Sequence, residues 1–344
     1  MRMVRFTPRF WISGLFFLLV AAFGILGPMF LGGKIGESVG GQYEPPSADA
    51  WLGLDDLGHD IFTSLMFGTR TSLIIGLVSG AVATFIGVAI GLFAGYHGGV
   101  LEEALMGVTN VALAIPSIVV LILLSVALDF RSIFAMAIVI AITSWPWTAR
   151  AVRAQASSVR TREHLDVARL SGAGTWNILL WDVLPYLMSY IAMAFVLQVS
   201  SAILAEAGLS LLGLGPSDGV SLGIMLNWAL VGESLRTGAW WAFVPPTLLL
   251  TLVAFTLLML QSSLDEVFNP RLRRGQSLRR TGGGAGAALA QVGVVGESAL
   301  PPEPEPEPVA LDAGDLPGPG ADDGSTGPSR SASAAGSNEG ASRG

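Results

Sequence analysis

Six mainly apolar stretches follow one another along the chain, separated by shorter polar segments. They cover residues 11–30, 72–95, 108–128, 133–147, 186–205 and 241–260. A helix that spans a bilayer needs about 20 mostly apolar residues. The pattern therefore predicts an all-α polytopic membrane protein with six transmembrane helices, of which the fourth is short and broken by Pro146.

The first stretch follows three arginines, as the apolar core of a secretory signal peptide would. Its apolar run is longer than the core of about 7–15 residues found in such peptides, so we expect a retained first span. The composition agrees with a membrane protein, because 51% of the residues are hydrophobic and only 13% are charged. Soluble domains carry about 25% charged residues.

The arginines predict the orientation of the spans. Thirteen lie on one side, in the N-terminal segment, the 148–184 loop and the stretch after the sixth span, whereas the other side has Lys34, Arg70, Arg131 and Arg236. The positive-inside rule places the thirteen, and with them both termini, in the cytoplasm. The short 96–107 loop falls on the same side, although it holds Glu102 and Glu103 and no arginine.

The residues divide into three predicted regions: an N-terminal helix with an extracytoplasmic segment (1–70), a transmembrane domain (71–274) and an acidic tail (275–344). The whole net charge of −7 comes from residues 281–344 of the tail, which is rich in proline, glycine and serine. Such a segment buries too little apolar surface to offset its ordering entropy. We expect a disordered cytoplasmic tail without a docking role, and no nucleic-acid partner, because a basic patch is absent.

The second stretch contains Gly76, Gly80, Gly87, Gly91 and Gly95, and three of the four intervals between them are four residues long. Small residues at this spacing form a groove that a neighbouring helix can approach closely. The groove is expected to pack inside the bundle or against a partner subunit. The alternative is that glycine is simply common in membrane helices.

The 148–184 loop is polar, yet part of it has a helical pattern. Residues 163–170 place Leu165 and Ala168 on one side, and Val167 and Leu170 add apolar surface. Two glycines then end the helix, and a second short amphipathic run covers residues 175–181. Two short helices of this kind predict a knob that docks into a groove of a soluble protein.

The spacing in this loop resembles the EAA loop of ABC importer permeases, which reads Glu-Ala-Ala, three residues, Gly, nine residues and Ile-x-Leu-Pro. Here Asp166-Val167-Ala168 is followed at the same intervals by Gly172 and by residues 182–185 (Asp-Val-Leu-Pro). Asp166 replaces glutamate and keeps its charge, Val167 replaces alanine, and Asp182 stands at the apolar position.

Four other stretches resemble the second, or C-type, permease of dipeptide, oligopeptide and nickel systems. They are residues 52–60 (Leu-Gly-Leu-Asp-Asp-Leu-Gly-His-Asp), 145–153 (Trp-Pro-Trp-Thr-Ala-Arg-Ala-Val-Arg), 204–215 (Leu-Ala-Glu-Ala-Gly-Leu-Ser-Leu-Leu-Gly-Leu-Gly) and 265–273, which ends in Asn-Pro-Arg-Leu-Arg. His59 stands where that family usually has arginine. The four stretches follow one another in the family's order over residues 9–274.

This resemblance implies a subunit that pairs with a second permease, two cytoplasmic ABC ATPase subunits and an extracytoplasmic solute-binding protein. The implied ATPase contact consists of Glu163, Asp166, Ala168, Gly172 and Gly174. The chain lacks a phosphate-binding loop, so we expect no ATP hydrolysis by the chain itself. Without cysteine, and with its three histidines far apart, it is expected to carry no metal site and no cofactor.

Glu206, Ser144 and Pro146 are candidates for the translocation path. A carboxylate within a span is a functional-site hypothesis, but Glu206 could equally be paired with a neighbour. Arg150 and Arg153 are expected to be anchors at the membrane boundary. Asp55, Asp56 and Asp60 are expected to form loop turns. This last group is alternatively a contact for the binding protein.

The resemblance implies short peptides as cargo, with nickel or another small solute as the alternative. Rival readings are a self-sufficient secondary transporter or channel, and a membrane enzyme. The first needs charged coupling sites at mid-membrane, and the predicted spans are nearly uncharged. The second needs a nucleophile or metal-ligand motif, which the sequence does not show.

Overall fold

The computed structural model describes residues 8–30, 35–128 and 132–268, and these residues form helices and connecting loops without a β-strand. Several predictions fall outside this range. They concern the tail (275–344), Lys34, Arg131, the arginines at positions 2 and 5, and those that follow residue 268. These predictions lie outside the described residues.

Five helices are long and apolar enough to cross a membrane. They are α1 (Pro8–Phe30), α2 (Ile61–His97), α5 (Ile133–Arg160), α8 (Leu184–Leu211) and α10 (Trp240–Phe268). The shorter ones are α3 (Gly99–Ala114), α4 (Ser117–Leu128), α6 (Glu163–Leu170), α7 (Thr175–Asn177), a π-helical turn (Ile178–Val183) and α9 (Leu222–Val231). The number of spans is six when α3 and α4 are taken as one bent span, so the predicted all-α membrane fold is confirmed.

Two prolines have opposite effects on their helices. Before Pro116 the backbone of Ile115 is extended, and α3 and α4 meet at a bend of 81°. Pro146 lies inside α5, which continues to Arg160, so the prediction of a short, broken fourth span is wrong. Two polar groups near Pro146 have partners, since the Ser144 hydroxyl donates to a carbonyl one turn back and Gln198 donates to the Ser144 carbonyl.

The segment predicted as the 96–107 loop is almost wholly helical. Helix α2 ends at His97 and α3 begins at Gly99, and the turn between them uses positive φ angles at Gly98 and Gly99. Of its two acidic residues, Glu102 contacts α5 and Glu103 is exposed. Arg153 forms an ion pair with Glu102, and Arg150 donates to the side-chain oxygen of Asn110 at 2.7 Å. The two arginines therefore contact α3, and their expected role as anchors at the membrane boundary stays a prediction.

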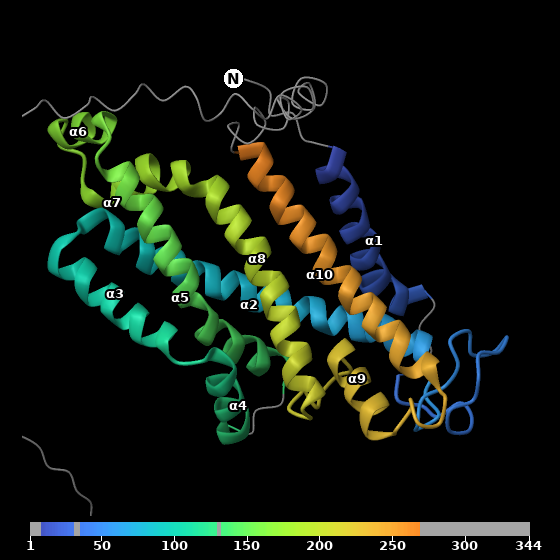
Figure 1. Ribbon diagram of the computed structural model, residues 1–344. Helices are drawn as coiled ribbons and strands as arrows, with labels where there is room; N and C mark the ends of the chain where they lie inside the picture. Colours follow the sequence, from blue (N-terminus) through green and yellow to red (C-terminus); the bar gives the residue numbers. More distant parts are fainter. Residues whose placement is uncertain (1–7, 31–34, 129–131, 269–344) are drawn as a thin grey trace, which may run out of the picture. The chain divides into compact units, whose positions relative to one another are not determined.

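Helix α2 lies at the centre of the described bundle and packs against α1, α5 and α8 (Figure 1). Its glycines account for this position. Gly76 and Gly80 face Val199 and Ile203 of α8, and the three later glycines face α5. The predicted small-residue groove is confirmed, and it is filled by helices of the same chain.

Replacing Gly91 with alanine is expected to destabilise the protein. A Cβ atom at Gly91 would lie 2.5 Å from the carbonyl oxygen of Ala149, so α5 must move away. Overpacking of this kind costs about 1–3 kcal/mol. Thermal unfolding in detergent measures the effect. Gly107→Ala is the control, because a Cβ atom there meets nothing within 4 Å. Equal melting temperatures for the two variants would contradict the close packing of α2 and α5.

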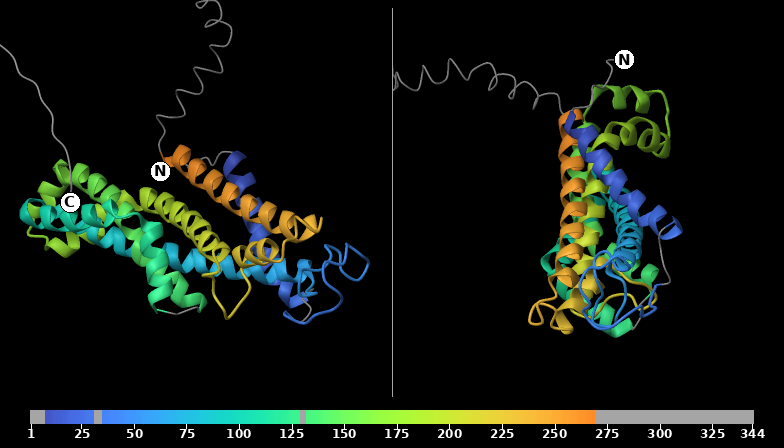
Figure 2. Two further views of the ribbon diagram at one scale, coloured as in Figure 1. Left: turned by 60° about the horizontal axis from the view of Figure 1, so that its bottom comes forward. Right: turned by 90° about the vertical axis from the view of Figure 1, so that its right-hand side faces the viewer.

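The two ends of the bundle differ. At one end, Figure 1 shows α6 and α7 above the beginning of α3, and we call this the α6 end. At the other end, residues 35–60 lie beside α9, which we call the α9 end. The Tyr43 hydroxyl donates to the carbonyl of Gly232 at 2.7 Å there. Figure 2 shows the same separation in its right-hand view.

Candidate functional site

Helix α6 is held against the bundle by one buried side chain. Leu165 is fully buried in a cluster with Val152 and Ala156 of α5 and with Ile178 and Leu179 of the π-helical turn. Ala168 packs against the same cluster. Residues 163–170 form the predicted amphipathic helix, but Leu165 and Ala168, which were expected in the surface that docks on a soluble protein, pack against the bundle instead. Helix α6 is thereby attached to both helices that flank it in sequence.

Polar contacts fix α6 further. The guanidinium of Arg169 lies 5.5 Å from the centre of the Tyr96 ring in α2, and that of Arg162 lies 5.0 Å from the Tyr186 ring in α8. The hydrogen bond with Tyr96, together with the charge of Asp166, raises the pKa of Arg169. Asp166 pairs with Arg169 at 2.9 Å. Helix α6 and the residue before it therefore contact α2, α5 and α8.

The opposite side of α6 presents apolar surface. Val167 and Leu170 are 62% and 88% exposed, and Trp176 and Trp181 close by are 62% and 75% exposed. Contiguous exposed apolar residues mark interaction sites. The sequence indicated Val167 and Leu170, but the two tryptophans were missed as contact candidates. Their signal was available, since tryptophan is rare in a polar loop and enriched at interfaces.

The glycines of the loop have distinct positions. Gly172 ends α6 with φ of +78°, a conformation that side chains with a Cβ rarely adopt. Gly174 precedes α7 with extended backbone. The second predicted helix is not separate from the next span, because α7, the π-helical turn and α8 form one continuous helical segment, Thr175–Leu211. The five predicted contact residues thus lie within or directly after α6.

A hollow of about 450 Å³ lies where the bend at Pro116 faces α5 and α8. It contains two of the three predicted path residues, Ser144 and Pro146. The lining is uncharged and contains apolar side chains together with polar ones from α4, α5 and α8. The lining residues are Ala112, Leu113, Ile115, Pro116, Ser117, Thr143, Ser144, Pro146, Trp147, Leu197, Gln198 and Ser201. The volume is in the range of small-molecule sites.

Gln198 is the polar centre of this region and was missed by the sequence reasoning. Its amide nitrogen donates to the Ser144 carbonyl and to the Thr148 hydroxyl, both at 2.8 Å, and so joins α8 to α5. The available signal was a single amide within the apolar 186–205 stretch. Polar side chains inside a membrane bundle usually hydrogen-bond across helices.

Glu206 lies apart from the hollow and is fully buried. Its carboxylate accepts hydrogen bonds from the hydroxyls of Ser210 at 2.6 Å and Ser72 at 3.1 Å. Ser72 in turn accepts from the backbone N–H of Leu222 at the start of α9. In the described chain the carboxylate is therefore paired with neighbours, and it connects α8, α2 and α9.

Replacing Glu206 with leucine is expected to lower thermal stability, because the hydroxyls of Ser72 and Ser210 lose their acceptor. An unsatisfied buried polar group costs about 1–3 kcal/mol. Glu206→Gln is the matched control, since its amide keeps one acceptor oxygen and should retain most of the stability. Melting temperatures in detergent distinguish the two variants. Loss of solute uptake by both variants with unchanged melting temperatures would instead indicate a role in translocation.

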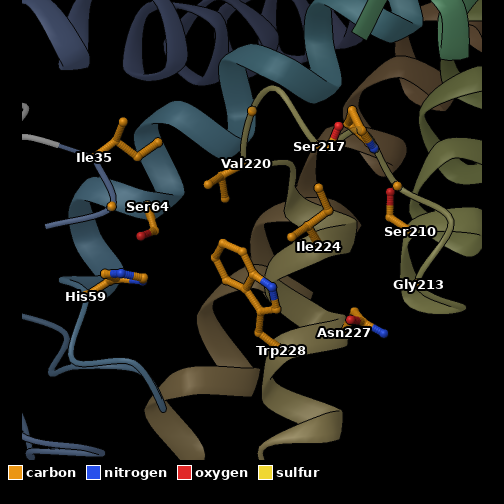
Figure 3. Close-up of a pocket in the computed structure, with 14 residues that line it drawn as sticks. Ile35, His59, Ser64, Ser210, Gly213, Ser217, Val220, Ile224, Asn227 and Trp228 are labelled. Carbon is orange, nitrogen blue, oxygen red and sulfur yellow. The ribbon is translucent and has the colours of Figure 1, made fainter. Parts of the chain in front are cut away.

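The α9 end holds a second hollow, of about 420 Å³. Figure 3 shows His59 and Ser64 facing Trp228 and Ile224 across it. The His59 imidazole nitrogen Nδ1 lies 3.2 Å from an oxygen of Asp55, whose other oxygen accepts from two backbone N–H groups of the same turn.

The predicted loop role of the aspartates that precede α2 is confirmed for Asp55 and Asp60. Asp55 holds the turn, and Asp60 caps the first turn of α2 through the backbone N–H groups of Phe62 and Thr63. Burial, and then the charge of Asp55, raises the pKa of Asp56. The polar residues at this end of the bundle thus order a loop.

Among the described residues, no group of three or more His, Asp or Glu side chains is placed to hold a metal ion. The two features that stand out chemically are therefore the exposed apolar side of α6 and the uncharged hollow at Pro116. They lie along the same helix, because α5 lines the hollow and then leads into α6.

Comparison with known proteins identifies a family of membrane transport proteins. Residues 87–274 match the family described as the binding-protein-dependent transport system inner membrane component. The chain is 34% identical to the dipeptide transport system permease protein DppC of Bacillus subtilis, over 76% of this chain and 82% of the relative. It is 33% identical to the oligopeptide transport system permease protein OppC of the same organism, over 67% and 75%. The OppC protein of Mycobacterium tuberculosis is 30% identical, over 69% and 80%. The chain therefore belongs to the family of binding-protein-dependent transport system inner membrane components, as an importer permease of the dipeptide and oligopeptide type.

Proposed function

We propose that the chain forms half of a translocation pathway for short peptides in an ATP-driven importer. A second permease supplies the other half, two ATPase subunits dock on the α6 end, and a solute-binding protein delivers the peptide at the α9 end. In this arrangement the α6 end and both termini are cytoplasmic. The uncharged hollow at Pro116 is the observation that carries the proposal.

The composition of the hollow favours peptides over metal ions. Its lining has hydroxyl groups from Ser117, Thr143 and Ser201 and the amide of Gln198, among apolar side chains. Such groups suit a peptide backbone, which needs uncharged donors and acceptors along an apolar wall. Nickel prefers imidazole, thiolate or carboxylate ligands, and none of these lines the hollow. The dipeptide and oligopeptide systems named for the relatives agree with this choice.

The exposed side of α6 supports the position of the ATPase contact. The helix is short, rigidly attached through Leu165 and apolar on its outer side. A helix of this kind is suited to a groove in a partner protein. Glu163, Asp166, Ala168, Gly172 and Gly174 belong to this contact in the proposal. Val167, Leu170 and Trp176 add its apolar part.

Uptake by a reconstituted complex tests the proposal. The chain is incorporated into proteoliposomes with its partner permease, the ATPase subunits and the binding protein, and is supplied with a radiolabelled dipeptide or with labelled nickel. We expect ATP-dependent accumulation of the dipeptide only. Accumulation of nickel without accumulation of the dipeptide would show that the importer carries nickel. Peptide uptake by the chain without ATPase subunits would favour a secondary transporter.

A further inference from the structure

Helix α3 is weakly attached to the rest of the described chain. Of its 16 residues only Thr109 is buried. One end follows the positive-φ turn at Gly98 and Gly99, and the other end meets the bend of 81° before α4. An element bounded by two breaks and held by few buried side chains can move as a unit. The position of α3 therefore depends on its polar contacts.

Two arginines of α5 supply those contacts. Arg153 forms an ion pair with Glu102, and Arg150 donates to the side-chain oxygen of Asn110 at 2.7 Å. We call these four residues the arginine clip. They surround a hollow of about 590 Å³ between the two helices. The residues of α3 that follow the clip, from Ala112 to the bend, line the hollow at Pro116.

The clip is also adjacent to the attachment of α6. Val152, next to Arg153, and Ala156, one turn later, belong to the buried cluster that holds Leu165 of α6. Helix α5 ends at Arg160, and α6 begins three residues further on. A continuous series of packed side chains thus leads from α6 through α5 to α3. Coupling between distant sites requires such a physical connection with two arrangements.

We propose that Arg150 and Arg153 are positioning residues that make α3 follow α5 when the ATPase subunits move α6. The inference rests on the proposed function. In one state of the ATPase, the clip holds α3 against α5 and the hollow at Pro116 has one shape. In the other state, α5 has moved, the clip has moved α3 with it, and the hollow has a second shape. Without the clip, α6 still moves and ATP is still hydrolysed, but the wall of the hollow no longer follows.

The test separates hydrolysis from transport in the reconstituted complex. Arg153→Glu and Glu102→Arg are each expected to lower the number of dipeptide molecules taken up per ATP hydrolysed by about tenfold. ATP hydrolysis stimulated by the binding protein is expected to continue. The double variant Arg153→Glu/Glu102→Arg restores an ion pair in reversed order and is expected to recover most of the ratio. A merely structural role would lower uptake and hydrolysis together.

Glu103→Arg is the matched control, because it makes the same charge change on α3 at the neighbouring, exposed residue, outside the ion pair of Arg153 with Glu102. We expect its uptake ratio to equal that of the unchanged chain. The inference is overturned when the single variants keep the normal ratio, or when the double variant is no better than either single one. Failure of the proposed function is a different result, in which the unchanged complex takes up no peptide. Size-exclusion profiles exclude variants that do not fold.

Discussion

Replacing Leu170 with aspartate is expected to abolish ATP-driven uptake, while the chain itself folds normally. Leu170 is the most exposed of the apolar side chains on α6, so a charge there leaves the isolated chain undisturbed. The proposed function places the same side chain in a groove of the ATPase in the assembled importer. A carboxylate buried without a partner costs about 3 kcal/mol, which corresponds to roughly a hundredfold weaker association.

Co-purification of ATPase subunits and uptake of labelled dipeptide measure this effect. Gln155→Asp provides the matched control. Gln155 is an exposed residue near the end of α5 that precedes α6, and it lies outside α6. It adds an equal charge and should keep both the complex and its activity. Normal uptake by the Leu170→Asp variant would show that the ATPase contact does not include the apolar side of α6.

Replacing Ser201 with tryptophan is expected to lower peptide uptake by at least about tenfold. Ser201 is an exposed residue of α8 that lines the hollow at Pro116. An indole ring there would occupy space that the proposed pathway requires for peptide. The substitution does not alter the proposed ATPase contact at the α6 end, so hydrolysis stimulated by the binding protein should remain.

Leu204→Trp is the control for this experiment. Leu204 lies one turn further along α8, is 46% exposed and is not part of the hollow. The same new side chain at that position should leave uptake close to normal. Equal losses in both variants would mean that a tryptophan on this side of α8 disturbs assembly. Normal uptake by both variants would mean that peptide does not pass through the hollow.

The apolar pattern located the spans well, because membrane burial acts on whole stretches of sequence. It could not decide between Pro116 and Pro146, which both stand within apolar runs. The difference lies in the tertiary structure. At Pro146 helix α5 continues, and the amide of Gln198 from α8 donates to the Ser144 carbonyl of α5. At Pro116 the preceding residue is extended and the helix is interrupted. The residues around a proline do not show where α8 will pack.

The same limit applies to the site. The periodicity of residues 163–170 was sufficient to predict the helix α6, because Leu165 and Ala168 recur at the spacing of an amphipathic helix. It did not show that this side packs against the bundle. The partners of Glu102 and Glu206 were not predictable. Arg153 is 51 residues away from Glu102 in sequence, and Ser72 is 134 residues away from Glu206. Pairs this distant depend on how the helices are arranged, which the α2 glycines determine only in part.

Site-specific cross-linking tests the central claim, that α6 is the contact with the ATPase, most directly. The sequence contains no cysteine, so Leu170→Cys introduces a single reactive thiol, and Gln155→Cys serves as the control. The thiol is labelled with a maleimide that carries a photoreactive benzophenone, which inserts into nearby C–H bonds on illumination, and the products are analysed by mass spectrometry. The account predicts a cross-link from position 170 to an ATPase subunit, at a yield that changes with bound nucleotide, and none from position 155. An ATPase cross-link from position 155 with none from position 170 would contradict it.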